Sequence, residues 1–176
     1  MIGSEDFKAA FRLHPAGVAL ITADPGGAPV AFTASSVSAV SADPPLAMFS
    51  VSVLSSSAEV LRRTDTVVIH LLSAKNLDLA QLGAARGVDR FADTTRWHRL
   101  PTGEPVFDAA DTWLRLRILH RVDAGGSAVF VGTAIESQVA QDADSDGLVY
   151  RNRTWHRLGA ASAIRVPELA DAAGRR

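Results

Sequence analysis

The sequence predicts a mainly β protein, an antiparallel barrel that is closed or partly split and carries short peripheral helices. Three observations predict this fold class. Several short apolar runs are separated by turn signals, the two longest runs alternate apolar and polar residues, and the strand-helix-strand repeat that builds a parallel sheet is missing. The 176 residues match the length of one folded domain, so we expect a single domain with a polar C-terminal tail at about residues 166–176.

The first third of the chain predicts a helix and three strands. A serine and two acidic residues precede Phe7 and Phe11, whose spacing indicates a short helix that ends at Pro15 and covers the core. Apolar runs bounded by Pro, Gly and Asp turn signals then predict a hairpin of two strands and a third antiparallel strand, at residues 17–23, 30–40 and 46–53.

The next segments predict two helices, one strand and a long connection. Ser56 stands three residues before a glutamate, the spacing of a capping box, which predicts a two-turn helix that starts near Ser57. A buried strand is expected at residues 66–72 and a second helix at 76–84. Residues 86–111 show no periodicity, so we expect a long loop there.

The last third predicts the two longest strands of the chain. Apolar and polar side chains alternate through residues 112–122 and 127–139, and the glycines between the two segments predict a hairpin. One further strand is expected over residues 148–158.

Composition and charge exclude several classes of function. A net charge of −1 gives no broad attraction to a polyanion, so we expect no nucleic-acid partner. The absence of cysteine excludes disulfides, thiolate metal sites and cysteine nucleophiles, and is compatible with the cytoplasm. The first ten residues carry charges and no apolar signal region, and prolines interrupt the apolar stretch that follows residue 26, so we predict a cytoplasmic protein without a membrane segment.

Familiar catalytic motifs are missing from the chain. Phosphate loops, dinucleotide fingerprints, zinc-binding helices and the hydrolase nucleophile elbow have no match in the sequence. The five histidines are far apart, so we predict no metal site. His70 and His120 lie inside apolar strands, where we expect hydrogen-bonded barrel residues.

Hydroxyl and small side chains are concentrated in three segments, residues 33–36, 50–52 and 55–57. This lining suits a flat, uncharged ring system, because small side chains let the backbone approach and hydroxyls meet ring carbonyls and nitrogens. The third segment also precedes a predicted helix, whose free N–H groups and dipole favour a cofactor phosphate. The alternative is that Ser56 only caps this helix. Arg62, Arg63 and Arg90 are candidates to balance the phosphate charge, unless they lie on a solvated face.

A series of short segments follows one order along the chain: Phe11, Gly17-Val-Ala-Leu-Ile-Thr22, Thr33-Ala-Ser-Ser36, Val40-Ser-Ala-Asp-Pro-Pro-Leu46, Ser55-Ser-Ser57, Asp89-Arg-Phe91 and the closing Tyr150 to Leu158. With this series the chain resembles the flavin reductase family over about residues 7–159. The resemblance implies the FMN-binding split-barrel fold and a homodimer that holds FMN or FAD non-covalently near the subunit interface. It also implies NADH or NADPH as reductant and a partner monooxygenase that receives reduced flavin.

The resemblance further implies roles for individual residues. The residues that would line the isoalloxazine ring are Thr33, Ala34, Ser35 and Ser36. Those that would meet the ring edge or ribityl chain are Ser50, Val51 and Ser52, and those that would hold the phosphate are Ser55, Ser56 and Ser57. Arg90 and Phe91 would contact the flavin from the long loop, and Trp155 and His156 would lie on the nicotinamide side. For Trp155, packing in the barrel is the alternative.

One motif departs from the family pattern. Family members carry Gly-Asp-His in the hairpin between the two long strands, and the histidine is associated with nicotinamide binding, whereas this chain has Gly125-Gly126-Ser127. Ser127 and His156 are therefore the candidates on the nicotinamide side. Hydride transfer to a flavin needs no side-chain acid or base, so no side chain is assigned as catalytic.

Three functions follow from these observations. The favoured one is reduction of FMN or FAD by NADH or NADPH. The second, motivated by Ser127, is a flavin-binding or electron-carrying barrel that does not use nicotinamide. The third is an interaction barrel without a cofactor, in which the serines are ordinary strand residues.

Overall fold

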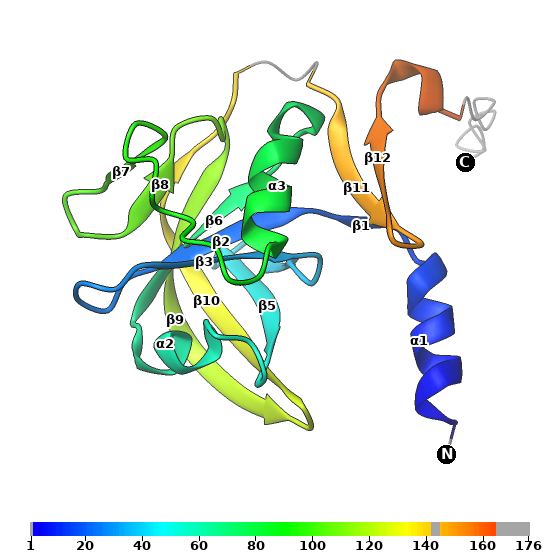
Figure 1. Cartoon of the computed structure of the whole chain (residues 1–176), viewed down its shortest axis with the longest axis horizontal. Helices are drawn as coiled ribbons and strands as arrows, with labels where there is room; N and C mark the ends of the chain where they lie inside the picture. The colour runs from blue at the N-terminus through cyan, green and yellow to red at the C-terminus, as the bar shows by residue number, and fades with distance from the viewer. Residues whose placement is uncertain (1, 142–144, 165–176) are drawn as a thin grey trace, which may run out of the picture.

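The computed structural model of the chain describes residues 2–141 and 145–164 (Figure 1). The expected polar tail at residues 166–176 lies outside these residues. The helices are α1 Ser4–Leu13, α2 Ala58–Arg63 and α3 Leu77–Ala84, with 3-10 turns η1 Ala74–Asn76 and η2 Ala160–Ser162. The strands are β1 Ala16–Gly17, β2 Ala19–Ala23, β3 Val30–Ala34, β4 Ser38–Ser41, β5 Leu46–Ser52, β6 Thr66–Leu71, β7 Trp97–Arg99, β8 Pro105–Phe107, β9 Trp113–Ala124, β10 Ser127–Gln138, β11 Gly147–Arg151 and β12 Thr154–Leu158.

A seven-stranded antiparallel sheet, in the order β3-β2-β6-β9-β10-β5-β4, forms the barrel. Its edge strands β3 and β4 follow one another in the chain, and no ladder of the described residues joins them, so the barrel stays open along this edge. The predicted antiparallel split barrel with short peripheral helices is therefore confirmed.

A side chain bridges the open edge of the barrel. Ser36 lies just after β3, and its Oγ donates a hydrogen bond to the carbonyl oxygen of Ser50 on β5 (3.1 Å). The same Oγ accepts a hydrogen bond from the Ser50 backbone N–H (3.0 Å). The hydroxyl of Ser36 thus takes the place of one rung of a β-ladder.

Strand alternation fills the barrel interior. Along β5, Ala47, Phe49 and Val51 are buried, whereas Ser50 and Ser52 keep contact with solvent. The ring of Phe49 stacks on that of Phe130 from β10, with centroids 5.1 Å apart. Aromatic stacking adds to the free energy gained from burying the two rings.

Helix α3 lies close against the outer face of β2 and β3. The hydroxyl of Thr33 donates to the carbonyl oxygen of Ala80 at 2.6 Å, and Leu20 is fully buried beneath the helix. A Cβ added to Gly83 would lie 2.4 Å from both Leu20 Cδ1 and Thr33 Oγ1. Position 83 therefore requires glycine because of the close approach of α3 to the sheet.

Two predicted segments are wrong in detail. Residues 86–111 are not a plain loop, because β7 and β8 form a hairpin there and Phe107 is buried. Residues 148–158 form a hairpin of β11 and β12 rather than one strand. The turn of this hairpin has Asn152 and Arg153 at φ of 50° and 60°, positions where glycine is common. Because neither residue is glycine, the sequence did not indicate a turn there.

The predicted role of α1 as a cover over the core is also wrong, because none of its residues is buried. The helix is attached to the β11–β12 hairpin instead, where Asn152 N–H donates to Arg12 O (2.7 Å) and Arg151 Nε donates to Leu13 O (2.9 Å). We call α1 with this hairpin the arm (residues 4–13 and 147–158). Figure 1 shows the arm at one side of the barrel, where β11 pairs with β1. Leu148 of β11 is buried in one cluster with Val18 and Leu20 of the barrel, and Trp155 packs against this cluster.

Two smaller expectations fail as well. His120 is exposed, because β9 runs beyond the core after Ile118. Helix α2 begins after Ser57 as expected, but its N-cap makes no side-chain hydrogen bond, so the capping box is not formed. Among the described residues, no helix has the length and apolar composition needed to cross a membrane.

His70 on β6 is the buried, hydrogen-bonded histidine that the sequence predicts. Its Nδ1 lies 3.0 Å from the carbonyl oxygen of Leu20, so this nitrogen is assigned the proton, and Nε2 accepts a hydrogen bond from Phe107 N–H (3.1 Å). Burial lowers the pKa of His70 to about 4 and keeps the ring neutral. The imidazole therefore joins three strands, β2, β6 and β8.

We predict that the free energy of unfolding decreases as pH falls from about 6.5 to about 4. In the unfolded chain His70 binds a proton below about pH 6.5, whereas in the folded chain it does so only below about 4. The contribution of the neutral ring is complete above this window and is lost within it, up to about 3 kcal/mol. Urea unfolding between pH 7 and 4 measures the slope, and an unchanged slope in His70→Gln would contradict the assignment.

Candidate functional site

A cavity of about 850 Å³, which we call cavity 1, lies between β5, the start of α2 and the end of α3. Its volume is in the range of about 300–1,000 Å³ that is usual for small-molecule sites. The three hydroxyl-rich segments all reach it, so segments around residues 33 and 55 that are apart in sequence meet here. Its lining residues are Phe32, Thr33, Ser50, Val51, Ser52, Leu54, Ser55, Ser56, Ser57, Gly83, Ala84, Arg86, Gly87 and Arg90.

A tight connection from β5 to α2 places three serines on the wall of cavity 1. Ser55 N–H donates to Ser52 O (2.9 Å), and Ala58 N–H donates to Ser55 O (3.0 Å). The hydroxyl of Ser55 also accepts a hydrogen bond from Ser57 N–H (3.3 Å). These bonds hold the connection in one conformation and gather the hydroxyls of residues 55–57 on one side of the cavity.

Arg90 reaches cavity 1 from the loop that follows α3. One of its terminal nitrogens, Nη2, donates to Ala85 O at 2.6 Å, which fixes the guanidinium. Its Nε–H is buried and has no hydrogen-bond acceptor among the described residues. A buried N–H donor without a hydrogen-bond acceptor costs free energy, so a ligand atom that accepts a hydrogen bond from this nitrogen would be bound favourably.

A second hollow of about 830 Å³, cavity 2, lies between the arm and the open edge of the barrel. Ser35 and Ser36 line it, whereas neither lines cavity 1. Ser50 lines both, so the two cavities adjoin at this residue. The lining residues of cavity 2 are Phe7, Phe11, Arg12, His14, Pro15, Ala16, Gly17, Ser35, Ser36, Val37, Ser38, Met48, Ser50, Tyr150, Arg151, Asn152 and Arg153.

Two residues that the resemblance assigned to the flavin point elsewhere. The side chain of Ala34 is buried in the barrel core. The ring of Phe91 is buried between Trp97 and Phe107, with centroid distances of 5.0 and 5.5 Å. Neither residue lines cavity 1 or cavity 2, so the structure offers no direct contact between these two side chains and a ligand in either cavity. Phe91 anchors the loop that carries Arg90 instead.

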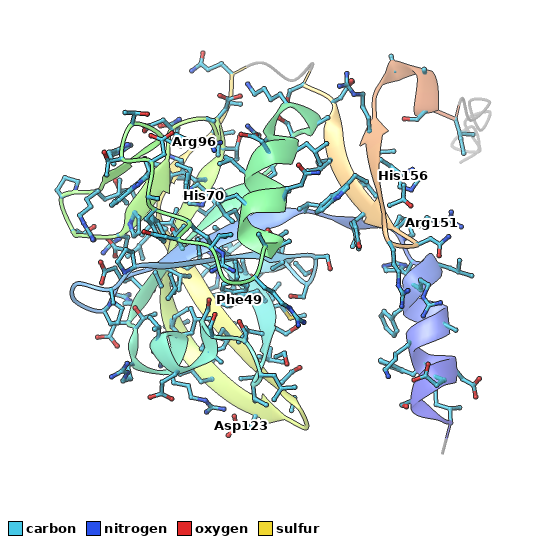
Figure 2. All side chains as sticks on the ribbon, viewed as in Figure 1. Phe49, His70, Arg96, Asp123, Arg151 and His156 are labelled. Atoms are coloured by element: carbon cyan, nitrogen blue, oxygen red, sulfur yellow. The ribbon has the colours of Figure 1, made fainter. Side chains whose placement is uncertain are left out.

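The candidates for the nicotinamide side are not brought together within one chain. Ser127 pairs with Ser52 across the ladder of β10 and β5, and so it neighbours cavity 1. Trp155 and His156 lie on β12 of the arm, and Figure 2 shows His156 at a distance from the barrel. The ring of Trp155 packs on Tyr150, with centroids 4.7 Å apart, and neither Trp155 nor His156 lines a cavity.

The sequence analysis missed several residues of cavity 1. Gly87, which has a φ of +70°, was not assigned to the site, and neither was Arg86 beside it. The sequence did not indicate the close approach of Gly83 to the sheet, because it depends on a long-range contact. The residues missed are Phe32, Leu54, Gly83, Ala84, Arg86 and Gly87.

The charge in cavity 1 has one sign. Arg86 and Arg90 are the charged residues among the described ones that line it, and no carboxylate accompanies them. The described residues also contain no group of three or more His, Asp or Glu side chains suited to a metal ion. The cavity therefore suits an uncharged body with an anionic end.

The fold and cavity 1 together define a split-barrel protein with a hydroxyl-lined cavity whose charged lining residues, among the described ones, are two arginines. The chain belongs to the flavin reductase family, because residues 11–159 match the family described as flavin reductase like domain.

Relatives and solved structures extend this result. The chain is similar to a protein named NADH:FMN oxidoreductase from Rhodococcus qingshengii, with 38% identity over 154 residues, which cover 86% of this chain and 80% of the relative. A flavin reductase domain protein from Arthrobacter sp. FB24 superposes with a TM-score of 0.84 and 32% identity, covering 94% of this chain and 98% of that one. BorF, the flavin reductase component of a bacterial two-component tryptophan halogenase, superposes with a TM-score of 0.79 and 27% identity, covering 89% and 99%.

The residues of cavity 1 fit a phosphorylated flavin. The buried Arg90 Nε–H lacks an acceptor, which a phosphate oxygen supplies. The hydroxyls of Ser50, Ser52 and residues 55–57 are further donors from residues that line the same cavity. When bound there, a flavin supplies the redox chemistry, and the chain supplies the binding groups.

We predict that Gly83→Ala weakens both the fold and flavin binding. The added Cβ meets Leu20 and Thr33, so α3 has to move outward and the hydrogen bond of Thr33 to Ala80 is stretched. We expect a loss of about 1–3 kcal/mol in the free energy of unfolding, typical of overpacking, together with a weaker Kd for FMN. Urea unfolding and flavin fluorescence quenching measure the two effects. Gln81→Ala, on the exposed face of the same helix, is the control, and equal behaviour of the two variants would contradict this account.

Proposed function

We propose that the protein catalyses reduction of FMN or FAD by NADH or NADPH and supplies the reduced flavin to a partner monooxygenase. The observation that carries the proposal is cavity 1, where hydroxyls from three separate segments and a buried arginine donor without an acceptor line one site. Membership of the flavin reductase family supports it. So do the names of two similar proteins, an NADH:FMN oxidoreductase and the reductase component of a two-component halogenase.

The chemistry is hydride transfer from the nicotinamide to the flavin ring, which the two bound molecules perform. The task of this chain is to bind both, to orient them and to keep water out. Thr33 has its hydroxyl fixed by Ala80 O, and residues 55–57 are fixed by the turn that precedes α2, so the wall of cavity 1 is preorganised before a ligand arrives. The flavin affinity therefore carries little cost for ordering these side chains.

A second function is favoured by one specific observation. Ser127 stands where the family motif has histidine, and it neighbours cavity 1 through Ser52. A flavin-binding or electron-carrying protein without nicotinamide chemistry is therefore the alternative that the experiment has to distinguish.

We expect the purified protein to oxidise NADH or NADPH in the presence of FMN or FAD, well above the buffer background. The loss of the reduced nicotinamide absorbance measures turnover. A flavin-loaded protein that is bleached by dithionite but not by either nicotinamide would establish the alternative. A protein that neither binds flavin nor turns over would remove both functions.

A pair of variants at Ser56 links turnover to cavity 1. Ser56→Asp places a carboxylate beside the expected phosphate, and like charges a few ångströms apart repel by more than about 1 kcal/mol near a protein surface. The KM for FMN should therefore rise by about tenfold or more, because each 1.4 kcal/mol corresponds to a factor of ten. Ser56→Asn introduces a side chain of nearly the same shape as aspartate but without the charge, and it should raise the KM for FMN much less than Ser56→Asp does.

We also propose a homodimer in which a second copy covers the arm. Helix α1 buries none of its residues. The rings of Phe7 and Phe11 contact each other in a tilted arrangement, with centroids 4.7 Å apart, while Phe7 is 52% and Phe11 61% exposed. A ten-residue helix is marginal by itself in water, so an apolar face of this kind calls for a partner. A second copy also offers a route by which Trp155 and His156 reach a flavin, namely one held by the other subunit.

The cytoplasmic location remains a proposal supported by the lack of cysteine.

We predict that sedimentation equilibrium finds a dimer for the natural chain and a monomer for Phe11→Glu. The glutamate places a charge on the exposed apolar face of α1, and burying it in an interface is unfavourable. Lys8→Glu, on the same helix at an exposed position, should remain dimeric. A natural chain that sediments as a monomer would contradict the proposed dimer.

A further inference from the structure

Arg86 is a charged residue of cavity 1 that neither the motif series nor the family resemblance assigned. It lies two residues after the end of α3, and the loop from Ala84 to Arg90 brings both Arg86 and Arg90 to the cavity wall. Ser55, Ser56 and Ser57 line the same cavity from the opposite connection. Two arginines and three serines therefore line one cavity.

The two arginines differ in their partners from seven other arginines of the described residues, each of which has a carboxylate in ion-pair range. Arg62, Arg99 and Arg115 each face a carboxylate, at N–O distances of 2.7, 2.7 and 2.8 Å. Within the described residues neither Arg86 nor Arg90 has a carboxylate in ion-pair range. The guanidinium charges in cavity 1 are thus left for a ligand to neutralise.

Arg90 is held in place for such a ligand. Its Nη2 is bound to Ala85 O, so the guanidinium plane is fixed, while its buried Nε–H remains without an acceptor. A guanidinium in this state keeps a buried N–H donor free for a negatively charged oxygen, such as an oxygen of a phosphate group. Arg86 adds a second positive charge from the same loop.

The flavins differ in the anion that they present. The phosphate monoester of FMN carries a charge between about −1.5 and −2 at pH 7, with a second pKa near 6. FAD has a diphosphate diester with a single charge on each phosphorus, and riboflavin has no phosphate. A pair of arginines therefore gains most from the flavin that concentrates two charges on one phosphorus.

We propose that Arg86 and Arg90 form a two-cation site for the terminal phosphate dianion of FMN, and that this pair makes the protein select FMN over FAD and riboflavin. The inference rests on the proposed function, because it concerns the flavin that cavity 1 takes. It assigns Arg86 as a specificity-determining residue, and it assigns the choice of flavin to phosphate charge rather than to contacts with the ring.

The test compares FMN, FAD and riboflavin at saturating reduced nicotinamide. For the natural protein the KM for FMN should be at least about tenfold below that for riboflavin, since hydrogen bonds to charged groups contribute about 1.5–3 kcal/mol. The KM for FMN should fall as pH rises through about 6, where the second proton leaves the phosphate, while the KM for riboflavin should not follow this profile. The KM for FAD should lie between the two.

Substitutions separate the contribution of Arg86 from general effects. Arg86→Ala should raise the KM for FMN about tenfold, leave that for riboflavin unchanged and flatten the pH profile. Arg86→Lys keeps the charge and should retain most of the preference for FMN. Arg63→Ala is the matched control, because Arg63 is an exposed arginine of α2 that pairs with Glu59 at 3.7 Å and does not line cavity 1.

The result that overturns the inference is an equal KM for FMN and riboflavin, or an unchanged ratio of the two in Arg86→Ala. Loss of turnover with every flavin is a different result, because it removes the proposed function. In that case Kd values for FMN and riboflavin from fluorescence quenching, measured on the same variants, decide the inference without turnover.

Discussion

The two-residue period of β5 couples the barrel core to cavity 1. Ala47, Phe49 and Val51 are buried in the core, whereas Ser50 and Ser52 lie on the other face of the strand and line the cavity, which Val51 also reaches. A shift of register by one residue would place the serines in the core and the phenylalanine outside, so hydrophobic burial fixes the orientation of the site. The free energy that stabilises the fold is therefore the same free energy that holds this wall of cavity 1 in place.

The fold was predictable wherever strands are long enough to show alternation. Strands β9 and β10 have twelve residues each, and their pattern and the glycines of their turn located the hairpin. Strands β7 and β8 have three residues each, too few for a period to be visible. The turn between β11 and β12 has Asn152 and Arg153 at positive φ. Arginine rarely adopts positive φ, so its presence does not predict such a turn. The helix α1 was located correctly, but its separation from the core depends on tertiary contacts that periodicity does not contain.

The site residues were predictable where polar side chains are close together in the sequence. They were not predictable where the packing of distant elements brings residues to the cavity. The hydroxyl-rich segments at residues 33, 50–52 and 55–57 do meet in cavity 1. Gly83 and Arg86 reach it because α3 packs on β3, a contact between elements that are far apart in the chain. The resemblance assigned Phe91 to the flavin, yet its ring is buried against Trp97 and Phe107, where it supports the loop beneath Arg90. A motif can mark a functional segment without every side chain in it touching the ligand.

The two hydrogen bonds between the Ser36 side chain and the Ser50 backbone can break more easily than a backbone ladder at the open edge of the barrel. A ladder rung breaks only when two main chains separate, whereas the Ser36 hydroxyl leaves both partners by rotation about one χ1 bond. Ser50 lines both cavity 1 and cavity 2, so the Ser36 hydroxyl is bonded to a residue that the two cavities share. The two hydrogen bonds between Ser36 and Ser50 can thus break for a net cost of about 1 kcal/mol each, while the hydrogen bonds of every β-ladder in the barrel remain formed.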